Sequence, residues 1–257
     1  MKPPVFPPGT ILQHLYLKER LNLIKSGHFL EVGCGKGFIS QILLDSGWSG
    51  IGCDLNQNSL DYATSLNRSA IERGKYQVAN QNFLTFTGSS KFDLIISCMV
   101  LEHLNDAEES TYFELVKKSL NPNGKMILIV PSCQDYWGCE DEIAGHYRRY
   151  SFLDMKAKLS NFGFTVNDLS GLTYPVSNIL YPISELLVSR AESKLKSKTM
   201  LERTKKSGNR NVFLKTNFPN IFKLLLNKFT MYPFHILQKC NKKNNKSLVI
   251  YAESTLL

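Results

Sequence analysis

The chain has 257 residues, of which 43% are hydrophobic and 21% charged, so it can bury a sizeable core and is not wholly disordered. No window holds the roughly 18 uncharged apolar residues of a transmembrane helix, and the proline-rich N-terminus lacks a secretory signal, which predicts a cytoplasmic protein. The net charge of +9 is concentrated in residues 190–246, with 15 Lys and Arg against two acids, while the rest of the chain is mildly acidic.

Hydrophobic periodicity predicts alternating strands and helices. Helices are expected at 10–25, 38–44, 56–73, 106–120 and, behind the capping-box pair Ser151 and Asp154, up to residue 161. Strands are expected at 28–32, 50–53, 76–79, 92–97, 125–130, 164–169 and 248–252, with a break at 121–124. The continuously apolar strands are typical of a parallel sheet buried on both faces.

This alternation predicts an α/β fold: a Rossmann-like, doubly wound, mostly parallel seven-stranded sheet with helices on both faces. About 75 residues separate the last two strands, too many for a plain loop, so we expect a helical insert before the last strand. The expected organisation is an N-terminal segment and lead helix at 1–27, a ligand-binding core at 28–171, a basic helical insert or lid at 172–246, and the last strand of the core at 247–257.

The strongest motif is Leu-Glu-Val-Gly-Cys-Gly-Lys-Gly at 30–37, directly after the first strand. Glycines there let the backbone turn tightly and approach a ligand. Asp54 follows at the end of the second strand, where a carboxylate can accept both ribose hydroxyls of a nucleoside. The G-x-G-x-G spacing with Glu31 before it differs from the dinucleotide fingerprint and fits a nucleoside ligand without phosphate.

The chain resembles class I S-adenosylmethionine-dependent methyltransferases, in particular the small-molecule group typified by ubiquinone and menaquinone biosynthesis. Four motifs carry the resemblance in order: LEVGCGKG, GCDLN at 52–56, FDLIISCMVLEHL at 92–104 and LNPNGKMILIVP at 120–131. The resemblance covers roughly residues 28–171 and the last strand, and it implies S-adenosylmethionine as the cofactor.

The resemblance also implies roles for single residues. Those expected to bind the cofactor are Glu31, Gly33, Cys34, Gly35 and Gly37 around its methionine and ribose, Asp54 at the ribose, Leu55, Asn82 and Phe83 at the adenine, and Cys98 and Met99 beneath the methyl group. Asn82 stands where the family usually has an acid, and its amide oxygen could accept the adenine amino group's hydrogen bond. No metal site is expected: the six cysteines are scattered, and neither Ser97 nor Cys98 can replace a hard magnesium ligand.

A second motif, Gly-His-Tyr-Arg-Arg-Tyr at 145–150, follows the fifth strand and resembles a bacterial subgroup of these methyltransferases. We expect Tyr147, Arg148, Arg149 and Tyr150 to bind the substrate and His146 to act as the catalytic base. The resemblance also implies a catalytic place for His103, which points toward the active site in the family. The alternative is structural: both arginines pair with nearby acids, His146 and Tyr150 fix the loop, and His103 is a polar residue at a helix start.

The basic segment mixes cations with apolar runs, and Ile221, Leu224, Leu225 and Lys228 follow helical spacing. Three interpretations stay open: the apolar face packs on the core, the segment contacts an anionic membrane or a lipid-linked acceptor at the inner membrane face, or it binds nucleic acid. The resulting hypothesis is methyl transfer to oxygen of a small-molecule, saccharide or lipid-linked acceptor. An RNA methyltransferase and a non-catalytic S-adenosylmethionine-binding protein are the alternatives, and the oligomeric state is not predicted.

Overall fold

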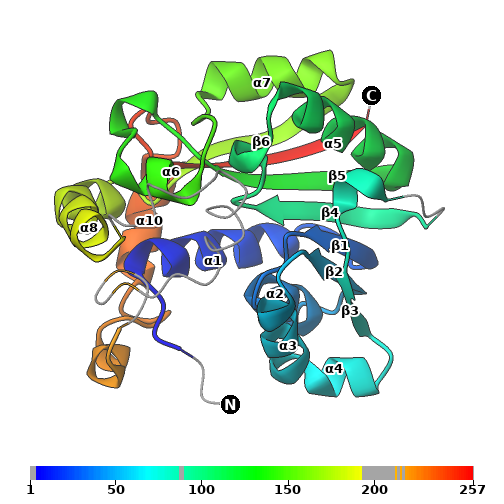
Figure 1. Cartoon of the computed structure of the whole chain (residues 1–257), viewed down its shortest axis with the longest axis horizontal. Coiled ribbons are helices and arrows are strands. Elements are labelled where there is room, and N and C mark those ends of the chain that lie inside the picture. Colours follow the sequence, from blue (N-terminus) through cyan, green and yellow to red (C-terminus); the bar gives the residue numbers. More distant parts are fainter. Residues whose placement is uncertain (1–3, 87–89, 193–211, 213–214, 216–217, 257) are drawn as a thin grey trace.

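The computed structural model describes residues 4–86, 90–192, 212, 215 and 218–256. Its centre is one seven-stranded sheet in the order β3-β2-β1-β4-β5-β7-β6 (Figure 1). The strands are β1 His28–Val32, β2 Ser49–Asp54, β3 Tyr76–Asn80, β4 Phe92–Cys98, β5 Leu120–Pro131, β6 Phe164–Leu172 and β7 Val249–Leu256. Only β7 runs antiparallel to its neighbours, so the expected mostly parallel seven-stranded sheet is confirmed.

Helices cover both faces of the sheet. They are α1 Pro8–Leu21, α2 Phe38–Asp45, α3 Gln57–Leu66, α4 Arg68–Glu72, α5 Asp106–Ser119, α6 Cys139–Ala144, α7 Phe152–Asn161, α8 Val176–Glu192 and α10 Tyr232–Cys240. Short 3-10 turns are η1 Phe83–Thr85, η2 Leu101–His103, η3 Gln134–Tyr136 and η5 Asn220–Leu224. One core cluster joins the sheet to α5 and α7, and the other joins it to α1, α2 and α4.

Two expectations about local structure were wrong in part. The helix expected at 56–73 is divided into α3 and α4 at Asn67, whose buried side chain donates to the carbonyls of Gly37 and Ala63. The break expected at 121–124 lies inside β5, because Leu120 already pairs with Phe92 before the register between β4 and β5 shifts.

The helix expected around residues 221–228 is also wrong, because only the 3-10 turn η5 forms there. Asn227 explains this locally. Its side chain accepts from the backbone N–H groups of Phe229 and Thr230 and donates to the carbonyls of Lys223 and Leu224. An asparagine that bonds the nearby backbone in this way competes with helix formation.

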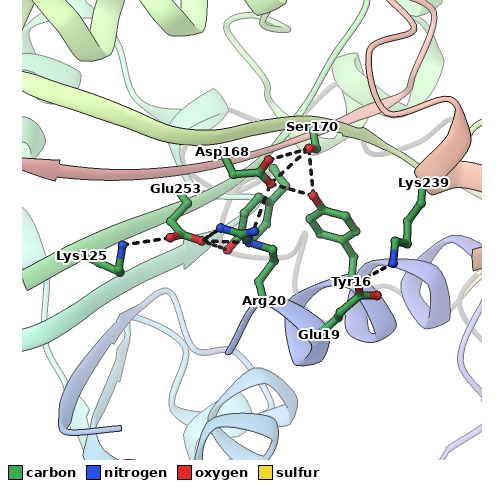
Figure 2. Close-up of polar contacts among 9 residues, drawn as sticks. Tyr16, Glu19, Arg20, Lys125, Asp168, Ser170, Lys239 and Glu253 are labelled. Atoms are coloured by element: carbon green, nitrogen blue, oxygen red, sulfur yellow. Dashed lines mark hydrogen bonds and ion pairs between the residues drawn. The ribbon is translucent and has the colours of Figure 1, made fainter. Parts of the chain in front are cut away.

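A buried polar network fixes α1 against the antiparallel half of the sheet (Figure 2). Arg20 donates two hydrogen bonds to Glu253 on β7, and Lys125 on β5 donates to the other oxygen of that carboxylate at 3.0 Å. The Tyr16 hydroxyl donates to Asp168 on β6 at 2.6 Å. Three strands that are distant in sequence therefore hold one helix in place.

The insert also packs against α1, which α10 contacts, while α8 contacts α6. Glu19 accepts from Lys239 of α10 and lies 2.8 Å from the Nε2 atom of His235. Among the described helices, none is long and apolar enough to cross a bilayer.

Candidate active site

A cavity of about 1170 Å³ lies at the carboxyl edge of β1, β2, β4 and β5. In an open α/β sheet this edge binds ligands where the strand order reverses, and here the reversal falls between β1 and β4. The volume exceeds the range of roughly 300–1,000 Å³ that holds one drug-sized ligand. The cavity is therefore large enough for two ligands side by side.

The glycine turn after β1 forms one wall. Gly33 has a φ of +72°, and a Cβ there would lie 2.5 Å from the Val100 side chain. Gly35 has a φ of +50°, and no described heavy atom would lie within 4 Å of a Cβ added to it, so its backbone faces open space. Asp54 fixes the turn, because its carboxylate accepts from the backbone N–H of Gly35 and of Asn56, each at 2.8 Å. A ligand in this space meets backbone and one carboxylate.

Three residues expected to bind the cofactor lie behind this wall and do not line the cavity: Glu31, Cys34 and Gly37. Glu31 is 2% exposed and accepts a hydrogen bond from Ser40. Burial raises the pKa of the Glu31 carboxyl to about 8. Contact between these three residues and a cofactor stays a prediction.

The remaining expected cofactor residues all line the cavity: Gly33, Gly35, Asp54, Leu55, Asn82, Phe83, Cys98 and Met99. Leu55 is 49% exposed, and Phe83 is a buried member of the same lining. The Asn82 oxygen already accepts from the Leu84 N–H at 3.0 Å, so one of its two lone pairs is used. Their roles as ligand contacts stay predictions.

The floor of the cavity follows β4. Burial raises the pKa of the Cys98 thiol far above its ordinary value, so the thiol is neutral at physiological pH. Met99 has a φ of 55°, which is uncommon for a residue with a side chain, and its N–H donates to Ile129 at 2.8 Å. Such strained positions concentrate at ligand sites.

His146 faces the cavity from the opposite side. Its Nδ1 atom lies 2.8 Å from Asp141, and Arg149 donates to both oxygens of the same carboxylate. Burial alone would raise the pKa of Asp141, but the hydrogen bonds from His146 and Arg149 outweigh it and lower that pKa to about 2. An ionised Asp141 only accepts, so the Nδ1 atom of His146 donates to it, and the Nε2 atom on the other side of the ring lies 3.9 Å from an oxygen of Glu102.

Glu102 and His103 complete this cluster. The His103 and His146 rings are 4.7 Å apart at 77°, and burial lowers the pKa of His103 to about 3. Glu102 is fully buried, and within the described residues neither of its carboxylate oxygens has a hydrogen-bond partner. Burial raises its pKa to about 7. One atom from each of Glu102, His103 and His146 lies within 4.8 Å of the others, a spacing that fits a metal ion, although no metal was expected from the sequence.

The four residues expected to bind substrate divide into two pairs. Tyr147 and Arg149 line the cavity, whereas Arg148 and Tyr150 do not. Arg148 is paired with Asp106 and Glu109 on α5, and the buried Tyr150 hydroxyl donates to Glu109. The polar groups of Arg148 and Tyr150 thus already have protein partners, and substrate binding by the four residues stays a prediction.

Three groups of site residues were not predicted from the sequence. Glu102 was named only as part of the motif at 92–104, although an acid directly before His103 was a usable signal, and Asp141 lies four residues before the motif at 145–150. The third group forms an apolar wall from the insert, with Leu180, Ile183 and Leu187 on α8 opposite Phe222 and Leu225. Nothing in the spacing of these residues predicted that they share a cavity with the glycine turn.

Comparison with known proteins gives consistent matches. Residues 10–169 match the family described as methyltransferase domain. The sequence is 28% identical over 119 residues to the ubiquinone biosynthesis O-methyltransferase of Pelagibacter ubique, which covers 46% of this chain and 48% of that protein. It is 32% identical over 108 residues to the probable 18S rRNA (guanine-N(7))-methyltransferase of Dictyostelium discoideum, covering 38% of this chain and 36% of that protein. The chain thus spans half or less of the length of these relatives.

Among solved structures, an S-adenosylmethionine-dependent methyltransferase from Clostridium acetobutylicum superposes with a TM-score of 0.55. The superposition covers 97% of this chain and 92% of that chain, at 14% sequence identity. At this identity the likeness shows a shared fold.

Proposed function

Because the chain belongs to the family of methyltransferase domains, we propose that it is a class I S-adenosylmethionine-dependent methyltransferase acting at a hydroxyl oxygen of a small-molecule, saccharide or lipid-linked acceptor. The observation that carries this proposal is one cavity shared by the glycine turn with Asp54 and by the His146 cluster. The turn offers a nucleoside site and the cluster offers a base, and the volume holds both ligands.

The cofactor residues are those on the β1, β2 and β4 side of the cavity. The Asp54 carboxylate receives the ribose hydroxyls, since each oxygen keeps a lone pair beyond its bond to the backbone. Leu55 and Phe83 provide apolar contact for the adenine, and Gly35 leaves room for the ligand to approach the backbone. When bound, S-adenosylmethionine supplies a methyl group on a positively charged sulfur.

His146 acts on the acceptor. Its Nε2 atom would accept the proton of the acceptor hydroxyl and so make the oxygen a better nucleophile for the methyl group that a bound cofactor would supply. Asp141 holds the ring in the required tautomer, and Arg149 holds Asp141. His103 stays neutral and packs against the His146 ring, so it adds no positive charge that would weaken the base.

Calorimetric titration with S-adenosylhomocysteine tests the cofactor assignment. We expect micromolar affinity, about −8 kcal/mol, that weakens at least about tenfold in Asp54→Ala through loss of hydrogen bonds to a charged group. Asp61→Ala is the matched control, because Asp61 is exposed on α3 and its carboxylate contacts Gln57. A folded protein that binds no S-adenosylhomocysteine would remove the proposal.

The base is tested separately with His146→Gln, which should retain S-adenosylhomocysteine binding and lose methyl transfer. The transfer is measured as S-adenosylhomocysteine released on incubation with fractionated cell extract. Tight cofactor binding without release in any fraction would favour a non-catalytic binding protein instead.

An RNA acceptor is the second candidate function, favoured by the likeness to the Dictyostelium rRNA methyltransferase and by the basic segment. RNA that copurifies with the protein and is released by salt, and that accepts labelled methyl groups, would favour it over the hydroxyl of a small molecule.

A further inference from the structure

We propose that the insert between β6 and β7 docks the protein on an anionic lipid bilayer. Twelve of the sixteen exposed large hydrophobic side chains in the described residues fall between positions 179 and 237, so the exposure is a property of this segment. They are Ile179, Leu180, Ile183, Leu186, Ile221, Leu224, Leu225, Phe229, Tyr232, Phe234, Ile236 and Leu237. An apolar surface of this kind on a protein marks an interaction site.

These side chains come from α8, from α10 and from the turns around η5, which lie together at one end of the molecule (Figure 1). Leu180 and Ile183 of α8 share a cavity with Leu225, and this cavity is the candidate active site. The exposed apolar surface is thus continuous with the active-site lining.

The charge of the segment selects an anionic partner. From Arg203 to Ala252 the sequence contains no Asp or Glu. Lys215 and Lys239 are already paired, with Glu140 and Glu19. The exposed Lys228, Lys242, Lys243 and Lys246 and the half-buried Lys223 add positive charge next to the apolar side chains. Lysines near the surface of an anionic membrane each strengthen its attraction.

The most exposed apolar side chains of the insert favour a bilayer over a nucleic acid or a second copy of the chain as the partner. Ile221, Leu224, Leu225 and Phe229 are between 66% and 79% exposed. A nucleic acid would satisfy the lysines and leave these four side chains in water, whereas a bilayer accepts both groups at once. A second copy of the chain would bury the apolar tips but would place two positively charged segments face to face.

The test is co-sedimentation of the full chain with vesicles of phosphatidylcholine alone or mixed with phosphatidylglycerol in equal parts. We expect binding to the mixed vesicles that weakens with salt. The variant Leu224→Ser with Phe229→Ser should lower the affinity by more than about tenfold through lost apolar burial. Lys223→Glu with Lys228→Glu should abolish the preference for phosphatidylglycerol.

Matched controls come from α7, on another side of the molecule (Figure 1). Leu153 is 81% exposed and Lys156 is exposed, so Leu153→Ser and Lys156→Glu change the same properties and should leave sedimentation unchanged. Every variant is also titrated with S-adenosylhomocysteine. Retained titration with lost sedimentation separates docking from the proposed methyl transfer.

Three outcomes would overturn docking. The first is no sedimentation with mixed vesicles. The second is RNA binding that depends on Lys223 and Lys228, together with vesicle binding that is unchanged when Leu224 and Phe229 are both replaced by Ser. The third is self-association in analytical ultracentrifugation that the Leu224 and Phe229 changes abolish and that excludes vesicle binding.

Discussion

The Nδ1 atom of His146 lies 2.8 Å from Oδ1 of Asp141, and this single contact decides which nitrogen of the imidazole faces the cavity. Asp141 is fully buried and receives Arg149 on both oxygens. The histidine, its acid and the arginine all belong to residues 141–149, so a short segment after β5 carries its own orienting group.

Asp141→Asn should destabilise the protein by about 3–5 kcal/mol, because the Arg149 side chain is only 7% exposed and would lose its charge partner. The pKa of Asp141 is lowered to about 2, so its stabilising contribution is complete above the ordinary value of 3.8 and is lost as the pH falls through 2. Urea unfolding at pH 7 measures the difference. Glu142→Gln, an exposed neighbour on α6, should change little; equal stability of both variants would contradict the structural role of Asp141.

Gly35→Ala and Gly74→Ala form a matched pair, since both glycines have positive φ and no described atom near an added Cβ. Each variant should lose about 1 kcal/mol of stability from backbone strain. Only Gly35 lines the cavity, so only its variant should lose affinity for S-adenosylhomocysteine, by about tenfold or more. Calorimetry measures the affinity of both variants for S-adenosylhomocysteine. Equal affinities for Gly35→Ala and Gly74→Ala would refute the placement of the cofactor beside Gly35.

Glu31→Gln should stabilise the ligand-free protein at high pH. Burial raises the pKa of Glu31 from 4.5 to about 8, so the unfolded chain ionises before the folded one. Stability from this group is greatest below pH 4.5, declines as the pH rises to 8 and is constant above it. The melting temperature of the variant relative to wild type should therefore rise from pH 5 to pH 8. Glu72→Gln serves as the control, because Glu72 is exposed. If the difference in melting temperature between Glu31→Gln and wild type did not change with pH, Glu31 would be ionised in the folded protein.

Glu253→Gln should lower the unfolding free energy by about 2–3 kcal/mol at pH 7, because Arg20 and Lys125 lose a buried charged acceptor (Figure 2). Burial alone would raise the pKa of Glu253, but hydrogen bonds from Arg20 and Lys125 hold it below the ordinary value of 4.5. The advantage of wild type is therefore full above pH 4.5 and shrinks as the pH falls below it. Denaturant titrations at pH 7 and pH 4 measure the difference in unfolding free energy between wild type and the variant. A larger difference at pH 4 than at pH 7 would contradict this prediction.

Much of the core followed from sequence because its signals are local. The apolar runs, the glycine turn and Asp54 at the end of β2 each depend on a few consecutive residues, and the sheet and the cavity wall form where they were expected. Ser151 also caps α7 with Asp154 as predicted.

The remainder depends on partners distant in the chain. Arg148 was expected to bind the substrate, and its pairing with Asp106 and Glu109 on α5, more than thirty residues earlier, could not be read from its own motif. Within the described residues the buried carboxylate of Glu102 has no hydrogen-bond partner, which is visible only once the fold packs it. In the insert, Asn227 overrides a helical pattern through side-chain bonds that periodicity does not encode.

The Arg20–Glu253 contact has a consequence for biosynthesis. The two residues are 233 positions apart, and β7 lies between β5 and β6, which are both made earlier. On the ribosome, α1 and these two strands therefore emerge before the strand that joins them. The parallel half of the sheet can assemble during translation, whereas the antiparallel half closes only after β7 leaves the exit tunnel. Ribosome-bound chains lacking β7 should thus expose the unpaired edge of β5 to chaperones.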